Sequence, residues 1–134
     1  MQINSRLLYD DLQKRATEAS ACSFSTGKQD DIGFSVGMQH AACVVFDLAH
    51  RIGFYIDAAI VLSELYSVAL DYLKDVFCEE KADDAYALEG IIRGLLRARE
   101  IVDLHKRAAE AEQRAVEEDE PPEPKPEVFY PYEE

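Results

Sequence analysis

The chain has 134 residues, of which 48% are apolar and 31% charged, so it is long enough for one compact domain but too short for two. Its net charge of −13 repels nucleic-acid phosphates and anionic membranes and favours a protein partner with a basic surface. No apolar run approaches the roughly 20 residues that cross a bilayer. We therefore expect neither direct nucleic-acid binding nor membrane association.

The negative charge is concentrated towards the end of the chain. Residues 1–108 contain 12 basic and 17 acidic residues, whereas residues 109–134 contain 2 and 10. The first residues lack the basic-then-apolar layout of a secretory signal, and the three cysteines form neither a disulfide framework nor a zinc motif. These features predict a cytoplasmic protein in which Cys43 and Cys78 are buried thiols.

The first half of the chain predicts two helices. Apolar side chains recur at helical spacing over residues 3–20, which indicates an amphipathic helix. Residues 21–27 are small and polar and end in glycine, so we expect a loop there. A second helix should begin at a cap formed by Asp30 or Asp31 and run to Arg51.

The second half predicts two more helices. Asp57 can cap a third helix, whose wide apolar stripe is typical of a central position. The polar residues 79–84 should form a turn, and Asp83 or Asp84 can cap a fourth helix that continues to about residue 118. The apolar side of this helix becomes sparse towards its end, so we expect its last turns to be solvated.

The fold class that follows is all-α. We predict a small helical bundle of about four helices over residues 1–118, followed by an acidic, proline-rich tail over residues 119–134 that ends in aromatic residues. The alternating pattern of a strand occurs only as a short possibility over residues 128–132.

Two of the predicted helices carry small residues at every fourth position. The two sets are Gly33, Gly37 and Ala41, and Gly90, Gly94 and Ala98. Each glycine costs a helix about 1 kcal/mol relative to alanine, and close packing against another backbone can offset this loss. The packing can be a helix crossing within the chain, or it can be an oligomerisation face of a homodimer or a helical scaffold.

Four acidic residues suggest the best candidate for enzymatic chemistry. Glu100 and Asp103 project from one side of a helix, and a second acidic pair facing them could hold Mg²⁺. The pattern resembles the all-α nucleoside triphosphate pyrophosphohydrolases related to MazG, and this resemblance implies Mg²⁺-dependent release of pyrophosphate. The set would be Glu80, Asp83, Glu100 and Asp103, with Asp83 where the family has a glutamate. Solvated surface acids, with no metal or cofactor, are the simpler interpretation.

Little else in the sequence indicates catalysis. There is no glycine-rich phosphate loop and no serine or cysteine with a nucleophile signature. The one basic cluster lies among acidic residues of the same predicted helix, so we expect intrahelical ion pairs; it consists of Arg93, Arg97, Arg99, Lys106 and Arg107. A non-enzymatic function is therefore the favoured one.

The most unusual segment is the tail. Its aromatic residues can anchor in a groove while its acidic residues steer the encounter, or the aromatic residues can fold back onto the chain's own helices. Together with the acids of the third helix and its exit, they form the predicted partner-binding set. This set is Asp71, Asp75, Glu79, Glu80, Asp83, Asp84, Phe129, Tyr130 and Tyr132.

The small size, the low pI and the early first helix accompany a second helix that opens with Asp-Ile-Gly-Phe-Ser-Val-Gly-Met at residues 31–38. In these features the whole chain is similar to the small acidic accessory proteins of bacteriophages and mobile elements, which include anti-CRISPR proteins. The resemblance is one of style, without a specific motif. It implies an acidic inhibitor of a basic, nucleic-acid-handling host protein such as a defence nuclease.

Overall fold

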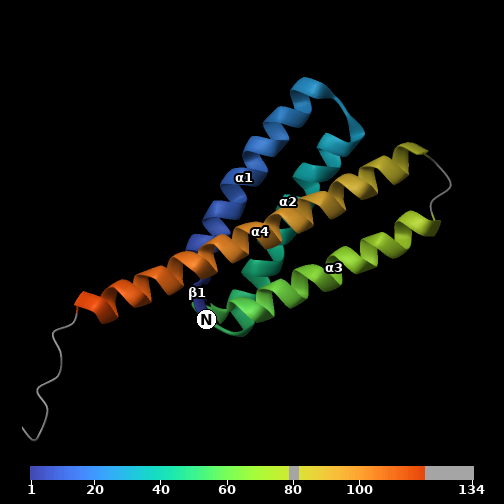
Figure 1. The fold of residues 1–134 in the computed structure, drawn as a ribbon. Coiled ribbons are helices and arrows are strands. Elements are labelled where there is room, and N and C mark those ends of the chain that lie inside the picture. Colours follow the sequence, from blue (N-terminus) through green and yellow to red (C-terminus); the bar gives the residue numbers. More distant parts are fainter. Residues whose placement is uncertain (79–81, 120–134) are drawn as a thin grey trace, which may run out of the picture.

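The computed structural model describes residues 1–78 and 82–119, which form four helices and two short strands. Figure 1 shows α1 (Ser5–Thr26) and α2 (Gln29–Arg51) as an antiparallel hairpin that α4 (Ala82–Asp119) crosses. The helix α3 (Ala58–Cys78) lies alongside α4. The all-α class and the four helices are confirmed, and the predicted tail beyond Asp119 lies outside the described residues.

The first helix differs from its prediction at both ends. It starts at Ser5, because the Asn4 side chain caps it by accepting hydrogen bonds from the backbone N–H groups of Arg6 (2.9 Å) and Leu7 (3.1 Å). The loop expected over residues 21–27 is wrong. Residues 21–26 contain no glycine or proline and stay helical, and the helix ends only at Gly27, whose φ of 66° is the left-handed conformation of a C-cap.

Two three-residue strands, absent from the sequence prediction, tie the start of the chain to the connection between α2 and α3. β1 (Gln2–Asn4) pairs antiparallel with β2 (Tyr55–Asp57). Ile3 lies opposite Ile56, and both side chains are buried. The Asp57 side chain accepts a hydrogen bond from the Ala59 N–H (3.0 Å), which confirms the predicted cap of α3. We call this pair of strands the strap.

The other predicted caps are placed differently. The helix α2 begins at Gln29 after Lys28, so Asp30 and Asp31 lie in its first turn and do not cap it. There their negative charges interact favourably with the positive end of the helix dipole. Asp83 and Asp84 belong to the first turn of α4, which begins at Ala82.

The two glycine stripes meet each other where α2 crosses α4. A Cβ atom added at Gly33 would collide with the carbonyl oxygen of Ala87, and one added at Gly37 would collide with that of Ile91. On the other helix, Gly90 and Gly94 are just as close to the backbone of α2. The stripes thus form a helix crossing within one chain, the first of the two interpretations above.

The oligomerisation assignment is corrected by this packing. Ala41 and Ala98 continue the two stripes and are also fully buried, so none of the six small residues lies on the surface of the chain. A homodimer or scaffold would need another face.

The core lies between α2, its partner α1 and the crossing helix α4. Leu8, Leu12, Val45 and Ile101 are fully buried there. By length and composition α2 could span a membrane, but many of its side chains are buried in this core. All side chains over residues 111–118 are exposed, which confirms the solvated end predicted for the fourth helix.

Candidate functional site: an aromatic cleft

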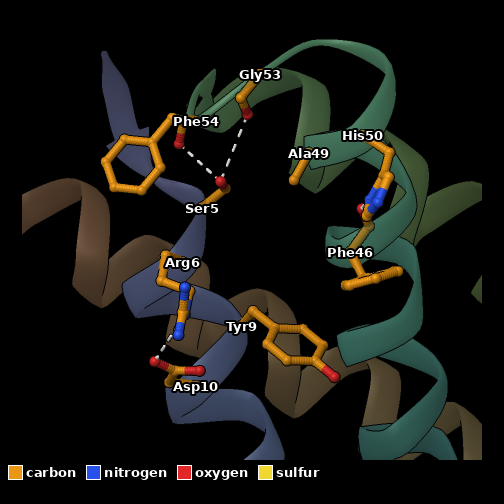
Figure 2. Close-up of a pocket in the computed structure, with 9 residues that line it drawn as sticks. All are labelled: Ser5, Arg6, Tyr9, Asp10, Phe46, Ala49, His50, Gly53 and Phe54. Carbon is orange, nitrogen blue, oxygen red and sulfur yellow. Dashed lines mark hydrogen bonds and ion pairs between the residues drawn. The ribbon is translucent and has the colours of Figure 1, made fainter.

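An aromatic cleft in the described part of the chain lies between the start of α1 and the end of α2. Figure 2 shows the side chains of both helices facing across it, with the connection from α2 to β2 above. Its volume is about 470 Å³ and it is open to solvent. The lining residues are Ser5, Arg6, Tyr9, Asp10, Phe46, Ala49, His50, Gly53 and Phe54.

The roof of the cleft is held by Ser5. Its hydroxyl donates a hydrogen bond to the carbonyl oxygen of Phe54 (2.7 Å), and its backbone N–H donates to the same oxygen (2.8 Å). Gly53 has a φ of 140°, a conformation that other residues rarely adopt, and this allows the chain to turn sharply from α2 into β2. The strap therefore fixes the roof above the two helices.

Aromatic rings make up most of the walls. The Phe46 ring lies 5.5 Å from the Tyr9 ring and 4.4 Å from the His50 ring, measured between centroids. Phe46 is 50% exposed and Phe54 is 54% exposed. Large aromatic side chains left half exposed around a concave surface are typical of a binding site.

The polar groups of the cleft are already engaged. Arg6 and Asp10 form an exposed ion pair on the rim (3.5 Å), so the cleft has little net charge. His50 donates from Nδ1 to the carbonyl oxygen of Phe46 (3.1 Å). Because the Ser5 hydroxyl bonds to a backbone carbonyl, it is not paired with a base as a nucleophile would be. This arrangement suits binding of an apolar side chain better than catalysis.

The predicted partner-binding acids do not belong to this cleft. Asp71 and Asp75 are exposed on α3, where they share one helix face with Glu64, and within the described residues none of the three forms an ion pair. The remaining members lie in segments whose side chains are not described or outside the described residues. These members are Glu79, Glu80, Asp83, Asp84, Phe129, Tyr130 and Tyr132.

The proposed magnesium ligands are not brought together. Asp83 and Glu100 belong to the same continuous helix, and 17 residues of helix separate them by about 26 Å. Glu100 instead pairs with Arg97 (2.8 Å), and Asp103 pairs with Arg107 (2.9 Å). The four acids therefore cannot bind one ion, and no other cluster of metal-binding side chains occurs over residues 1–78 and 82–119.

One titratable group joins two helices on the inner side. Asp11 of α1 accepts hydrogen bonds from His105 of α4 (2.8 Å) and from Arg15 (2.8 Å). Partial burial raises the pKa of Asp11, but the hydrogen bonds from His105 and Arg15 outweigh it and hold this pKa below its usual value of 3.8. These contacts connect α1 to α4 and have a structural role. We call the cluster of Asp11, Arg15 and His105 the clasp.

The prediction that Cys43 is a buried thiol is wrong. Cys43 is exposed, as is Cys22, and both are free thiols. The apolar sequence neighbours of Cys43 face the core, whereas its own position on α2 faces solvent.

Sequence reasoning did not find the aromatic cleft. Its residues come from three short segments, 5–10, 46–50 and 53–54, and the only local signal is the spacing of Phe46 and His50 on one helix face. Comparisons with protein-family models, with curated proteins and with solved structures found no match to this chain, so the character of this site follows from its geometry alone.

Proposed function

We propose that the chain is a non-enzymatic protein-binding module whose aromatic cleft takes up an apolar side chain of a partner protein. The observation that supports this function is the half-exposed state of Phe46 and Phe54 around a concave surface with little net charge. Burial of such rings provides much of the energy of protein interfaces, and the surrounding polar rim excludes water.

The charge distribution supports a partner with a basic surface. Six arginines form ion pairs with acids of the same chain, whereas Glu64, Asp71 and Asp75 expose carboxylates along α3. The chain as a whole carries a charge of −13. Long-range attraction would speed association with a positively charged surface, while contacts in the cleft would set the lifetime of the complex.

The class of partner can be narrowed from the chemistry of basic protein surfaces. Proteins that handle nucleic acids expose basic channels and grooves, and a compact acidic domain can occupy them in place of a phosphate backbone. The proposed role is therefore that of a cytoplasmic inhibitor of a nucleic-acid-handling protein, in keeping with the resemblance to accessory proteins of mobile elements.

The test compares aromatic variants in and outside the cleft. The partner is captured with the wild-type chain, purified, and titrated against Phe46→Ala and Phe54→Ala. We expect each substitution to weaken binding by about 30-fold, the effect of an interface hot spot of about 2 kcal/mol. Phe24→Ala is the matched control, because this ring is 88% exposed at the opposite end of α1.

A second pair of variants tests the charge argument. Asp71→Asn combined with Asp75→Asn should reduce the association rate and its dependence on salt while leaving the dissociation rate almost unchanged. If the cleft variants bind the partner as tightly as the Phe24→Ala control, the cleft is not the binding site. If the partner surface is acidic and binding strengthens with added salt, the proposed class of partner is wrong.

A further inference from the structure

The outer side of α3 is apolar although it faces solvent. Figure 1 shows α3 beside α4 at the edge of the molecule. Its inner side, which includes Val61 and Leu65, is buried in the core. A second row is only partly covered, since Tyr66 is 49%, Leu70 39% and Leu73 40% exposed. The spacing of four and three residues in this row is typical of a helix that packs against another helix. Within the described residues, the wide apolar stripe that predicted a central helix is therefore covered on one side only.

The partly covered row continues across the contact between α3 and α4. One shallow groove, of about 660 Å³, is lined by Leu62 and Leu96. A second groove, of about 470 Å³, is lined by Leu73 and Ile92. Leu96 is 41% exposed. Positions 62, 66, 70 and 73 share one side of α3, so the two grooves belong to one surface. We call this surface the seam face; it consists of Leu62, Tyr66, Leu70, Leu73, Ile92 and Leu96.

The seam face carries little of the negative charge of the chain. Helical spacing places the acids of α3 over residues 58–75 on the opposite side of the helix; they are Glu64, Asp71 and Asp75. At the edges of the two grooves, Asp30, Glu100 and Asp103 pair with arginines of α4. Among the described residues, Glu89 is the one other carboxylate that lines a groove. A basic partner would gain little here, whereas a second apolar and nearly neutral surface suits this face.

The middle of the α3 row lies level with the middle of the apolar pair on α4. Leu62 shares a groove with residues 96–107 of α4, and Leu73 shares one with residues 86–93. Because the rise per residue is the same along both helices, residue 68 lies level with about residue 95. This level is close to the point midway between Ile92 and Leu96. The apolar side chains are therefore distributed symmetrically about one line that crosses both helices.

This symmetry makes the seam face complementary to itself. A two-fold axis along that line turns a second copy over, so that α3 packs antiparallel on α3 and α4 packs antiparallel on α4. Tyr66 of each copy then lies against Leu70 of the other. In the same way Ile92 lies against Leu96. Apolar side chains meet apolar side chains at each position, as the isologous interface of a dimer requires.

The size of the seam face suits a weak dimer. Over residues 58–75, α3 is about 27 Å long, and two adjacent helices are together about 20 Å wide. The face therefore offers about 500 Å² on each copy, or about 1,000 Å² in total, which is the lower limit for a specific interface. We expect a Kd of about 10–100 μM for an interface of this size.

We infer that two copies of the chain associate through the seam face and form an antiparallel bundle of four helices at the interface. The acids of α3 stay on the outside of this bundle, so they remain free to meet a basic surface. The seam face shares no residue with the aromatic cleft, so the inference does not rest on the function proposed for the cleft. Each dimer presents two such clefts.

The first experiment measures the mass of the full-length chain by sedimentation equilibrium from about 1 μM to 1 mM. We expect a dimer that dissociates on dilution. Tyr66→Glu and Leu70→Lys should each weaken it by at least about 100-fold, because every dimer carries the charged side chain twice. Phe24→Lys is the matched control: it places a charge at an 88% exposed ring on α1 and should leave the dimer unchanged. Added salt should strengthen the wild-type dimer, because it screens the repulsion between two chains of charge −13.

The second experiment mixes the two charged variants in equal amounts. The antiparallel arrangement places the introduced carboxylate of one chain against the introduced ammonium group of the other. We therefore expect the mixed dimer to be at least about tenfold tighter than the dimer of either variant with itself. Circular dichroism checks that both variants are folded, and Leu73→Ser, at a 40% exposed position, is a third seam-face variant that introduces no charge.

Three results would overturn the inference. A wild-type chain that is monomeric at about 1 mM would leave the seam face to a different protein. A dimer that Tyr66→Glu, Leu70→Lys and Leu73→Ser do not weaken, or that Phe24→Lys weakens equally, would assign the contact to another surface. A mixture that associates no better than each variant alone would show that the antiparallel arrangement is wrong.

Discussion

Replacement of Gly37 by alanine tests the crossing of α2 and α4 most directly. In an unobstructed helix this change raises stability by about 1 kcal/mol, because alanine has the higher helix propensity. At Gly37 the new methyl group would collide with the carbonyl oxygen of Ile91 and lie 3.1 Å from the Cα atom of Gly94. Both atoms belong to the backbone of α4 and cannot rotate away, so the helices must separate. Overpacking of this kind costs about 1–3 kcal/mol. Since the propensity gain of about 1 kcal/mol opposes this cost, we expect a net loss of stability of up to about 2 kcal/mol.

The free energy of unfolding is measured by urea denaturation followed by circular dichroism, with the m-value checked for constancy. Ala21→Gly is the matched control: it changes an exposed position of α1, and we expect it to lose about 1 kcal/mol from propensity alone. Gly37→Ala combined with Gly94→Ala should lose less than the sum of the single variants, because the two glycines contact each other. A stability gain of about 1 kcal/mol in Gly37→Ala would show that the two backbones are not in contact.

Three further changes probe the clasp, the cleft and the first helix. The folded state lowers the pKa of Asp11 below its usual value of 3.8, so its carboxylate stabilises the fold above that pH, and this contribution is lost as the pH falls through the lower folded value. Asp11→Asn should remove that part of the acid dependence in denaturation curves recorded from about pH 5 downwards. Ser5→Ala should cost about 1 kcal/mol and speed hydrogen exchange in the strap, because the Phe54 carbonyl loses its hydroxyl donor. Asn4→Ala should cost about 1 kcal/mol in thermal denaturation through loss of the α1 cap.

The helices were predictable because helical periodicity is a local property. The spacing of apolar residues predicted four helices, and the sparse apolar side past Leu104 predicted the solvated end of α4. The glycine stripes predicted a close backbone contact, but periodicity alone could not say whether the second backbone was in the same chain. Only the arrangement of α2 and α4 answers that question.

The strands and the cleft could not be predicted because they depend on residues far apart in the sequence. Each strand has three residues, too few for an alternating pattern to be recognised. The cleft needs Ser5 to lie under Phe54, a neighbourhood that exists only after the strap has formed. Arg99 shows the same limit, because its intrahelical pairing was expected from composition, yet its guanidinium faces Tyr66 of α3.

The strap also has a consequence for the order of folding. It joins residues 2–4 to residues 55–57, and closing a loop of this length has an entropic cost that three short backbone pairs cannot offset by themselves. The α1–α2 hairpin, whose contacts are closer in sequence, must therefore form first and hold the two strands near each other. We expect the strap to be among the last parts of the chain to form and the first to open, so the aromatic cleft reaches its final shape only when folding is complete.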